Sequence, residues 1–270
     1  GGGNLAAIAL GNSRSAGLKW NLAYTYTDAT EVSNLSSSTN GSNWGARASF
    51  NPNEEVAANS SYLVRDRVNG SLTWEKRFFG AYKTTFGAFY EGRTGKPYSW
   101  TYNNDMNGDA VASNDLMFIP SAFGSGEVVF RGDTATSKVN ETKFWDTVNS
   151  IPELKRSVGR VTQRHDSFAP WTNSLDLRVS QEVPGLFAGH KGTFVLDIAN
   201  FGNMLNKKWG RINEVGFASA GGNSRSFVDY AGMENGKYVY QVRDSVEDYV
   251  TKQNRGESQW ALQLTARYEF

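Results

Sequence analysis

Oxygen-bearing side chains recur at short spacing near the middle of the chain. They are Asp105, Asn107, Asp109, Asn114 and Asp115. Carboxylate and amide oxygens at alternate positions are typical of calcium-binding loops. The sixth and twelfth positions of this loop are Ala110 and Leu116, where an EF-hand has Gly and Glu. The pattern therefore predicts either a calcium site or an Asx-rich turn whose side chains bond nearby backbone groups.

The segment around these residues, about 101–170, is rich in aromatic side chains. The candidates for contact with a substrate are Trp100, Tyr102, Phe123, Phe144 and Trp145. Aromatic side chains offer large contact areas and are enriched where proteins bind partners. We therefore expect a loop that captures a ligand or partner. Packing of the loop on itself is the alternative, and the two are compatible.

No recognised catalytic arrangement accompanies these residues. His165 and His190 are the only histidines and cysteine is absent, so a zinc site or a histidine-based triad has little support. No nucleophile elbow, P-loop or dinucleotide fingerprint occurs in its required context. The 28 Lys and Arg nearly balance the 27 Asp and Glu, without a basic stripe for nucleic acid. We expect neither catalysis nor nucleic-acid binding.

The elements that carry these residues are predicted from an alternation of apolar and polar side chains. At the C-terminus the apolar set is Trp260, Leu262, Leu264, Ala266, Tyr268 and Phe270, with mainly polar residues between them. Such alternation indicates a strand with one apolar face. It predicts eight strands, at about 18–27, 68–78, 82–91, 174–183, 193–198, 207–217, 237–243 and 260–270.

Two fold classes share this alternation, the soluble β-sandwich and the transmembrane β-barrel. Lys, Arg, Asp and Glu in the middle of the polar faces favour a hydrated barrel lumen. Short and long connections also alternate, with 79–81 short and 28–61, 101–170 and 245–258 long. Outer-membrane barrels alternate periplasmic turns and extracellular loops in this way. One connection, 218–235, is too long for the periplasmic turn that the scheme requires there.

The hydropathy of the chain is compatible with a barrel. Its mean hydropathy is -0.51, and no apolar run approaches the length of a membrane helix, which excludes a helical membrane protein. Barrel strands average to a polar composition because their two faces differ. The first residues, Gly1 to Asn4, show no signal peptide, so a barrel implies a fragment or a processed product.

Several stretches are also distinctive as sequences. They are residues 68–72, 89–99 (FYEGRTGKPYS), 105–109, 114–120, 170–171, 175–178, 197–210 and the terminal 267–270. Together they resemble, in order, the Oar-like branch of TonB-dependent outer-membrane receptors, over most of residues 18–270. The resemblance implies an all-β fold, a transmembrane antiparallel up-and-down β-barrel. Residues 1–270 would supply about the last eight of about 22 strands, with long extracellular loops.

The resemblance also implies a function and partners. The protein would be a bacterial outer-membrane receptor, energised through TonB, for uptake or export of a large substrate that the sequence does not identify. Its partners would be the lipid bilayer, the TonB complex acting through a plug domain absent from this chain, and the barrel-assembly machinery reading Tyr268 and Phe270. No cofactor is expected apart from the calcium ion considered above.

Two alternatives stay open beside this interpretation. The first is a passive outer-membrane pore or structural barrel without energy coupling, which a TonB box and plug domain upstream would exclude. The second is a soluble β-sandwich binding module, which solubility without detergent would support. Fold analogy cannot choose a substrate, because similar barrels carry very different ones.

Overall fold

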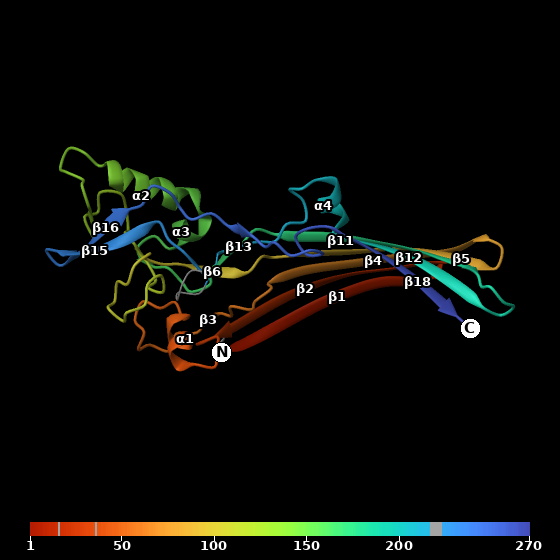
Figure 1. The fold of residues 1–270 in the computed structure, drawn as a ribbon. Helices are drawn as coiled ribbons and strands as arrows, with labels where there is room; N and C mark the ends of the chain where they lie inside the picture. Colours follow the sequence, from red (N-terminus) through yellow and green to blue (C-terminus); the bar gives the residue numbers. More distant parts are fainter. Residues whose placement is uncertain (16, 36, 217–222) are drawn as a thin grey trace.

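A large antiparallel sheet dominates the computed structural model, which describes residues 1–15, 17–35, 37–216 and 223–270. The strand order is β1-β2-β4-β5-β11-β12-β18, and the short β3 pairs with β2. Their bounds are β1 (Gly2–Ser15), β2 (Leu18–Glu31), β3 (Ala58–Asn59), β4 (Asp66–Phe79), β5 (Tyr82–Arg93), β11 (Thr172–Pro184), β12 (Lys191–Ala199) and β18 (Ala261–Glu269). The fold is therefore predominantly β, as expected. Among the described strands the sheet is open, with β1 and β18 at opposite edges (Figure 1).

The register aligns the apolar residues of neighbouring strands into continuous rows. Because side chains alternate between the two faces of a strand, residues directly opposite one another share a face. One row crosses six strands through Leu18, Trp74, Phe86, Val179, Leu196 and Leu264. The next contains Trp20, Leu72, Ala88, Leu177, Ile198 and Leu262. We call this side the apolar face.

The other side, the polar face, carries ion pairs between neighbouring strands. Arg178 lies 3.4 Å from Asp197, and Lys191 lies 3.4 Å from Glu182 and 3.2 Å from Glu269. Further pairs join Arg67 to Glu91 and Lys83 to Glu75. Each of these residues alternates with members of the apolar rows. The two faces of the sheet therefore differ sharply in chemistry.

Short connections lie at one end of the sheet and long ones at the other. β4 and β5 are joined at Gly80, which has the left-handed φ of 64° that favours glycine in a turn, and β11 and β12 are joined by residues 185–190. The long connections are 32–65, 94–171 and 200–260. The first contains the helix α1 (Asn40–Gly45). This is the alternation that the sequence predicts.

Two predicted strands, at 207–217 and 237–243, are not in the large sheet. β13 (Asn213–Glu214) pairs with β17 (Val250–Thr251), and β16 (Lys237–Val242) lies between β15 (Val228–Glu234) and β8 (Val129–Phe130). The prediction was wrong because the alternating Tyr238, Tyr240 and Val242 pack into a different core. Residues 200–260 are thus one long connection, so the turn expected at 218–235 is not a sheet turn. Residues 217–222 lie outside the described residues.

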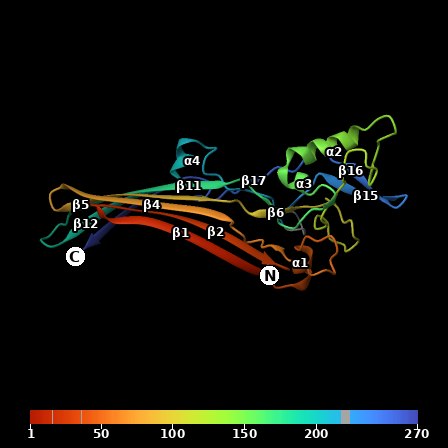
Figure 2. The same ribbon diagram turned by 180° about the vertical axis from the view of Figure 1, so that it is seen from behind.

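The last two long connections fold together into a second unit, which we call the cap (residues 94–171, 213–216 and 223–251). Figures 1 and 2 show it beyond one end of the sheet, opposite the β4–β5 turn. It contains β6 (Pro97–Trp100), β7 (Phe118–Ile119), β8, β9 (Arg160–Val161), β10 (Ser167–Phe168), β13, β14 (Ser224–Arg225), β15, β16, β17, α2 (Val139–Ser150) and α3 (Pro152–Arg156). The sequence interpretation did not include these helices.

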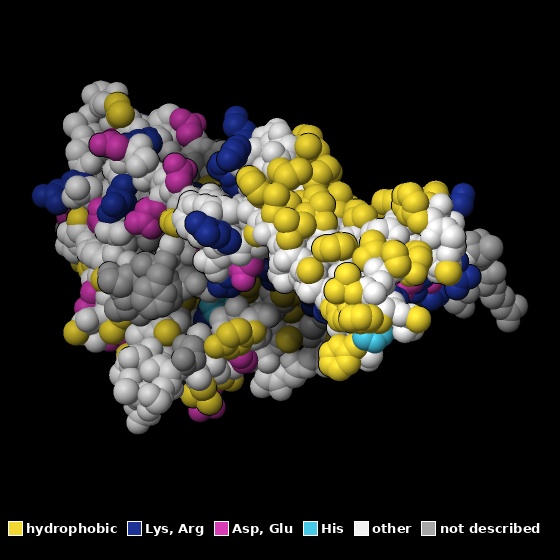
Figure 3. All heavy atoms as spheres, turned by 45° about the vertical axis from the view of Figure 1, so that its right-hand side comes forward, with side chains coloured by type: hydrophobic (Ala, Val, Ile, Leu, Met, Phe, Trp, Pro, Cys, Tyr) yellow, Lys and Arg dark blue, Asp and Glu magenta, His cyan; other side chains and the backbone are white. Residues whose placement is uncertain are grey.

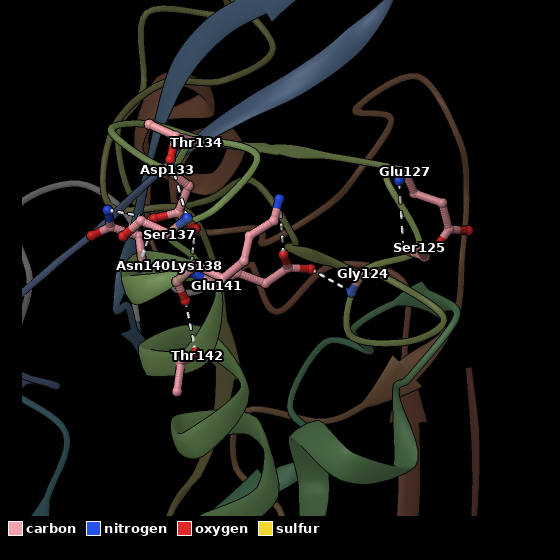
Figure 4. A network of polar contacts seen from close by, with 10 residues as sticks. All are labelled: Gly124, Ser125, Glu127, Asp133, Thr134, Ser137, Lys138, Asn140, Glu141 and Thr142. Atoms are coloured by element: carbon pink, nitrogen blue, oxygen red, sulfur yellow. Dashed lines mark hydrogen bonds and ion pairs between the residues drawn. The ribbon is translucent and has the colours of Figure 1, made fainter.

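Polar contacts hold the start of α2 (Figure 4). The carboxylate of Asp133 accepts hydrogen bonds from the backbone N–H groups of Asn140 (2.8 Å) and Glu141 (2.9 Å), which have no partner within the helix. The Glu141 carboxylate accepts one from the backbone N–H of Gly124 (2.6 Å) and lies 3.6 Å from the Lys138 ammonium. Negative charge here also matches the helix dipole.

Asparagines fix the end of β12 against the start of β18. Asn200 has a left-handed φ of 51°, and its side chain donates hydrogen bonds to the carbonyls of Gly210 and Glu257, both at 2.8 Å. Asn203, in the short helix α4 (Phe201–Leu205), donates to the carbonyl of Trp209 at 2.8 Å. These contacts close the loop that carries the chain from the sheet towards the cap.

Candidate functional site

The apolar face of the large sheet is the most extensive candidate surface. Six members of its two rows are exposed, from 36% for Trp74 to 83% for Leu264, and the other six are half-buried. A β-sandwich would bury such rows under a second sheet. Among the described residues the remaining sheets are short and belong to the cap or its connection, so the rows are uncovered. Contiguous apolar surface of this extent marks contact with a partner or a membrane.

The strand lengths match the thickness of a bilayer. β2 and β4 each have 14 residues. At a rise of about 3.3 Å per residue such a strand is about 46 Å long, and a tilt of about 40° reduces its height to about 35 Å. The hydrocarbon core of a bilayer is about 30 Å thick. The strands are therefore long enough to cross it.

Aromatic residues gather near both ends of these strands. Towards the short turns lie Trp74 and Phe78, whose rings meet edge to face. Towards the cap, the Tyr24 hydroxyl donates a 2.6 Å hydrogen bond to Asp66, and Tyr90 and Trp171 both donate to the Asn173 side chain, at 3.0 and 2.8 Å. Aromatic bands at both ends of the strands are typical of the interfaces of a transmembrane barrel, and the band towards the cap also directs its hydroxyl and indole groups to hydrogen-bonding partners.

No helix among the described residues combines the length and the apolar composition needed to cross a membrane.

The aromatic residues expected to contact a substrate fall into two groups. Trp100, Tyr102, Phe144 and Trp145 are buried in the core of the cap, whereas Phe123 is 52% exposed. The rings of Tyr102 and Tyr240 lie edge to face and their hydroxyls are 2.8 Å apart, and Tyr240 donates to the carbonyl of Phe118 at 2.7 Å. Burial raises the pKa of Tyr102 to about 12. The four buried residues therefore stabilise the cap, and in this conformation only Phe123 presents its ring to solvent.

The oxygen-rich loop is organised by Asx turns. Asp105 accepts hydrogen bonds from the backbone N–H groups of Gly108 (2.7 Å) and Ala110 (2.9 Å). Asn107 accepts from Asp109 N–H, and Asp109 accepts from Val111 N–H, each at 2.9 Å. Ala110 has the left-handed φ of 66° that glycine would adopt more readily. The side chains thus perform the turn-forming role that the sequence offered as one of two alternatives.

Asp115 and Asn114 are the buried members of this set. The Asp115 carboxylate accepts backbone hydrogen bonds from Met106 (2.5 Å) and Asn107 (3.3 Å), while its other oxygen and the Asn114 side-chain oxygen have no partner. Burial raises the pKa of Asp115 to about 6, and backbone hydrogen bonds oppose the shift. No group of three or more His, Cys, Asp or Glu suited to a metal occurs within the described ranges. Calcium binding stays a prediction.

The residues predicted to form the barrel-assembly signal lie at the end of β18. Tyr268 is on the apolar face, and its hydroxyl accepts a hydrogen bond from the backbone N–H of Leu186 (3.2 Å) and contacts His190 Nδ1 (2.8 Å). Phe270 is almost fully exposed. An exposed terminal aromatic is accessible to a partner.

Sequence reasoning missed a hollow lined by cations beside the start of β18. We call it the basic hollow, and its charged lining residues are Lys207, Arg211, Lys252 and Arg255. Its volume is about 680 Å³, and Trp260 and Leu262 of the apolar face form part of its wall. The cations come from two segments about 45 residues apart, so no basic run marks them in the sequence. The pair Lys207-Lys208 beside Trp209 was the available signal.

No protein-family model, curated protein or solved structure matches this chain.

Proposed function

We propose that this chain forms part of the wall of a transmembrane β-barrel in a bacterial outer membrane, with the apolar face against lipid and the polar face lining a hydrated lumen. The observation that carries the proposal is the contrast between the two faces: uncovered apolar rows on one and cross-strand ion pairs on the other. In water those rows would leave much apolar area exposed, and each Å² of it would cost about 25 cal/mol of free energy relative to burial. Lipid removes that cost.

Topology gives the proposed barrel an orientation. Outer-membrane barrels place short turns in the periplasm and long connections outside. The turns at 80–81 and 185–190 would accordingly face the periplasm. The cap would lie on the outer surface, where a packed unit above the wall can contact arriving molecules. Phe123 is then the one candidate aromatic already exposed for such a contact.

The more specific part of the proposal is a TonB-dependent receptor that moves a large substrate. It rests on the resemblance of segments such as 89–99 and 197–210 to the Oar-like receptors. The remaining strands and the plug would come from chain outside residues 1–270. Crosslinking of the complete receptor to TonB in intact cells separates this proposal from a passive pore, which forms no such crosslink.

The lipid-facing assignment is tested by two adjacent substitutions on β18. Leu264→Arg places a charge on the apolar face, and Thr265→Arg places the same charge on the polar face. We expect Leu264→Arg to destabilise the inserted barrel by about 2–4 kcal/mol and Thr265→Arg to have little effect. The measurement is the folded, heat-modifiable fraction recovered from outer membranes of cells expressing the receptor.

The same pair distinguishes lipid from water as the surroundings of the apolar face. Leu264 is 83% exposed, so in a soluble sheet an arginine there would be tolerated. Equal recovery of the two variants would contradict the membrane assignment.

A further inference from the structure

The basic hollow combines strong positive charge with position at the edge of the apolar face. Four cations line it, and no acidic residue does. Lys252 lies 2.5 Å from Glu257, which neutralises one of them. Within the described part of the chain, the Arg211 guanidinium donates a hydrogen bond to the carbonyl oxygen of Lys207 (2.5 Å), and none of Lys207, Arg211 and Arg255 has an ion-pair partner. The hollow therefore keeps a net positive charge.

A second hollow adjoins it and extends the same chemistry. It has a volume of about 440 Å³, and Arg211 lines both. Its wall includes Lys208, Trp171 and Trp209, and both tryptophans are exposed. Figure 3 shows a broad hydrophobic area on the sheet side of the molecule with Lys and Arg side chains along its border towards the cap. Cations thus follow directly after the aromatic band at this end of the strands.

The spatial order of these surfaces, from apolar rows through tryptophans to cations, matches the layers of a lipid leaflet. Aliphatic rows correspond to acyl chains, the exposed tryptophans to the interface, and the cations beyond them to the depth of the headgroups. Lysine and arginine bind phosphate oxygens through charge-assisted hydrogen bonds, which are stronger than neutral ones. Because the cations surround a hollow rather than a convex surface, several can reach one phosphate group together.

We propose that the basic hollow binds the phosphorylated headgroup of a lipid in the outer leaflet. The proposal rests on the proposed function, because only a chain inserted in the membrane brings the hollow to this depth. The lipid lies with its acyl chains along Leu262 and the neighbouring apolar rows, and its phosphate contacts Lys207, Arg211 and Arg255. A lipid held there would lie between the wall and the connections that lead to the cap.

The test uses the complete receptor, purified in detergent, and native mass spectrometry with two probes: diphosphorylated lipid A and the same lipid without its phosphates. The test variant is Lys207→Gln with Arg255→Gln. The matched control is Lys155→Gln with Lys237→Gln, two exposed cations of the cap without ion pairs among the described residues. We expect the test variant to bind the phosphorylated lipid about tenfold more weakly, and the control to bind it like the unmodified protein.

Two further measurements, the salt dependence of binding and displacement by inorganic phosphate, complete the test. Binding of the phosphorylated lipid to the unmodified protein should weaken as salt is added, which requires no variant to fold. Equal affinity for the two lipids, or no difference between test variant and control, overturns the proposal. Displacement of the lipid by inorganic phosphate at equal concentration would identify a free phosphate site and overturn the lipid assignment. Failure of the unmodified receptor to insert into bilayers would instead contradict the proposed function.

Discussion

At the scale of single residues, the aromatic and acidic side chains of the cap act first through packing. Tyr102 and Tyr240 bury their rings and satisfy their hydroxyls with each other and with the Phe118 backbone. The Asp115 carboxylate accepts hydrogen bonds from two backbone N–H groups of the Asx loop, and its other oxygen has no partner. A buried carboxylate with an unpaired oxygen is costly when it is ionised. Its protonation should therefore influence the stability of the cap.

Asp115→Asn should stabilise the cap above pH 6 by roughly 1–2 kcal/mol, because the folded state binds a proton at Asp115 more tightly than the unfolded chain. The pKa of this carboxyl is about 6 when folded, against an ordinary value of 3.8. The native protein thus loses stability as pH rises from about 4 to 6, and the advantage of asparagine should vanish near pH 4. Urea unfolding followed by tryptophan fluorescence at several pH values measures this.

Asp146→Asn, at an exposed position of α2, is the control and should change stability little at any pH. A loss of stability in Asp115→Asn above pH 6, together with stabilisation of the unmodified protein by added calcium, would contradict this account. That outcome would identify Asp115 as a ligand of the cation that the sequence suggested.

At the scale of elements, the first backbone N–H groups of α2 are bound by a residue that lies outside the helix. Its N-cap position is Lys138, which makes no side-chain capping bond, and Asp133 supplies the acceptor from the preceding loop. The helix then buries Phe144 and Val148 against the cap core. The position of α2 therefore depends on a loop contact as well as on apolar packing.

Replacing Asp133 with alanine should destabilise the cap by about 1 kcal/mol, because two backbone N–H groups at the start of α2 lose their acceptor. Asp146→Ala removes an acidic residue from the exposed side of the same helix and serves as the reference. Thermal unfolding monitored by near-ultraviolet circular dichroism compares the two. Equal midpoints would show that Asp133 does not stabilise the helix.

Most strands of the large sheet could be predicted from the sequence, whereas β1 and the helix α2 could not. Alternation located β2, β4, β5, β11, β12 and β18, because long strands with one apolar face have a clear period. It missed β1, whose sequence Gly2–Ser15 contains mostly small residues and few large apolar ones. It placed 237–243 in the wrong sheet, since a local period does not say which surface a strand will cover. The helix α2 was hidden because its apolar positions are few.

The candidate sites were predictable to a similar degree. The Asx pattern at 105–109 was visible because turn formation depends on residues close in sequence. Burial of Trp100 and Phe144 was not, because it depends on contacts with Phe227 and Tyr240 from a distant connection. The basic hollow likewise joins residues near 210 with residues near 255. Long-range contacts of this kind leave no mark in local sequence.

At the scale of the whole molecule, the chain combines a large sheet and a cap, which bury their apolar side chains in different ways. The cap has its own core and ordinary burial. The core cluster of the described residues lies in the cap and not in the large sheet, whose two edge strands β1 and β18 each pair with one strand only among the strands described. Such edges favour pairing with further strands or aggregation. Insertion in a bilayer within a larger barrel would satisfy both the apolar face and the edges.

The most direct test of the membrane assignment is a scan of single cysteines along β12, from Phe194 to Ile198, each carrying a spin label in the receptor reconstituted in bilayers. The chain has no native cysteine, so each label has one position. We predict that Phe194, Leu196 and Ile198 will be accessible to oxygen and protected from a water-soluble nickel complex, with the opposite result at Asp197 on the polar face. Accessibility to nickel at all five positions would contradict the account.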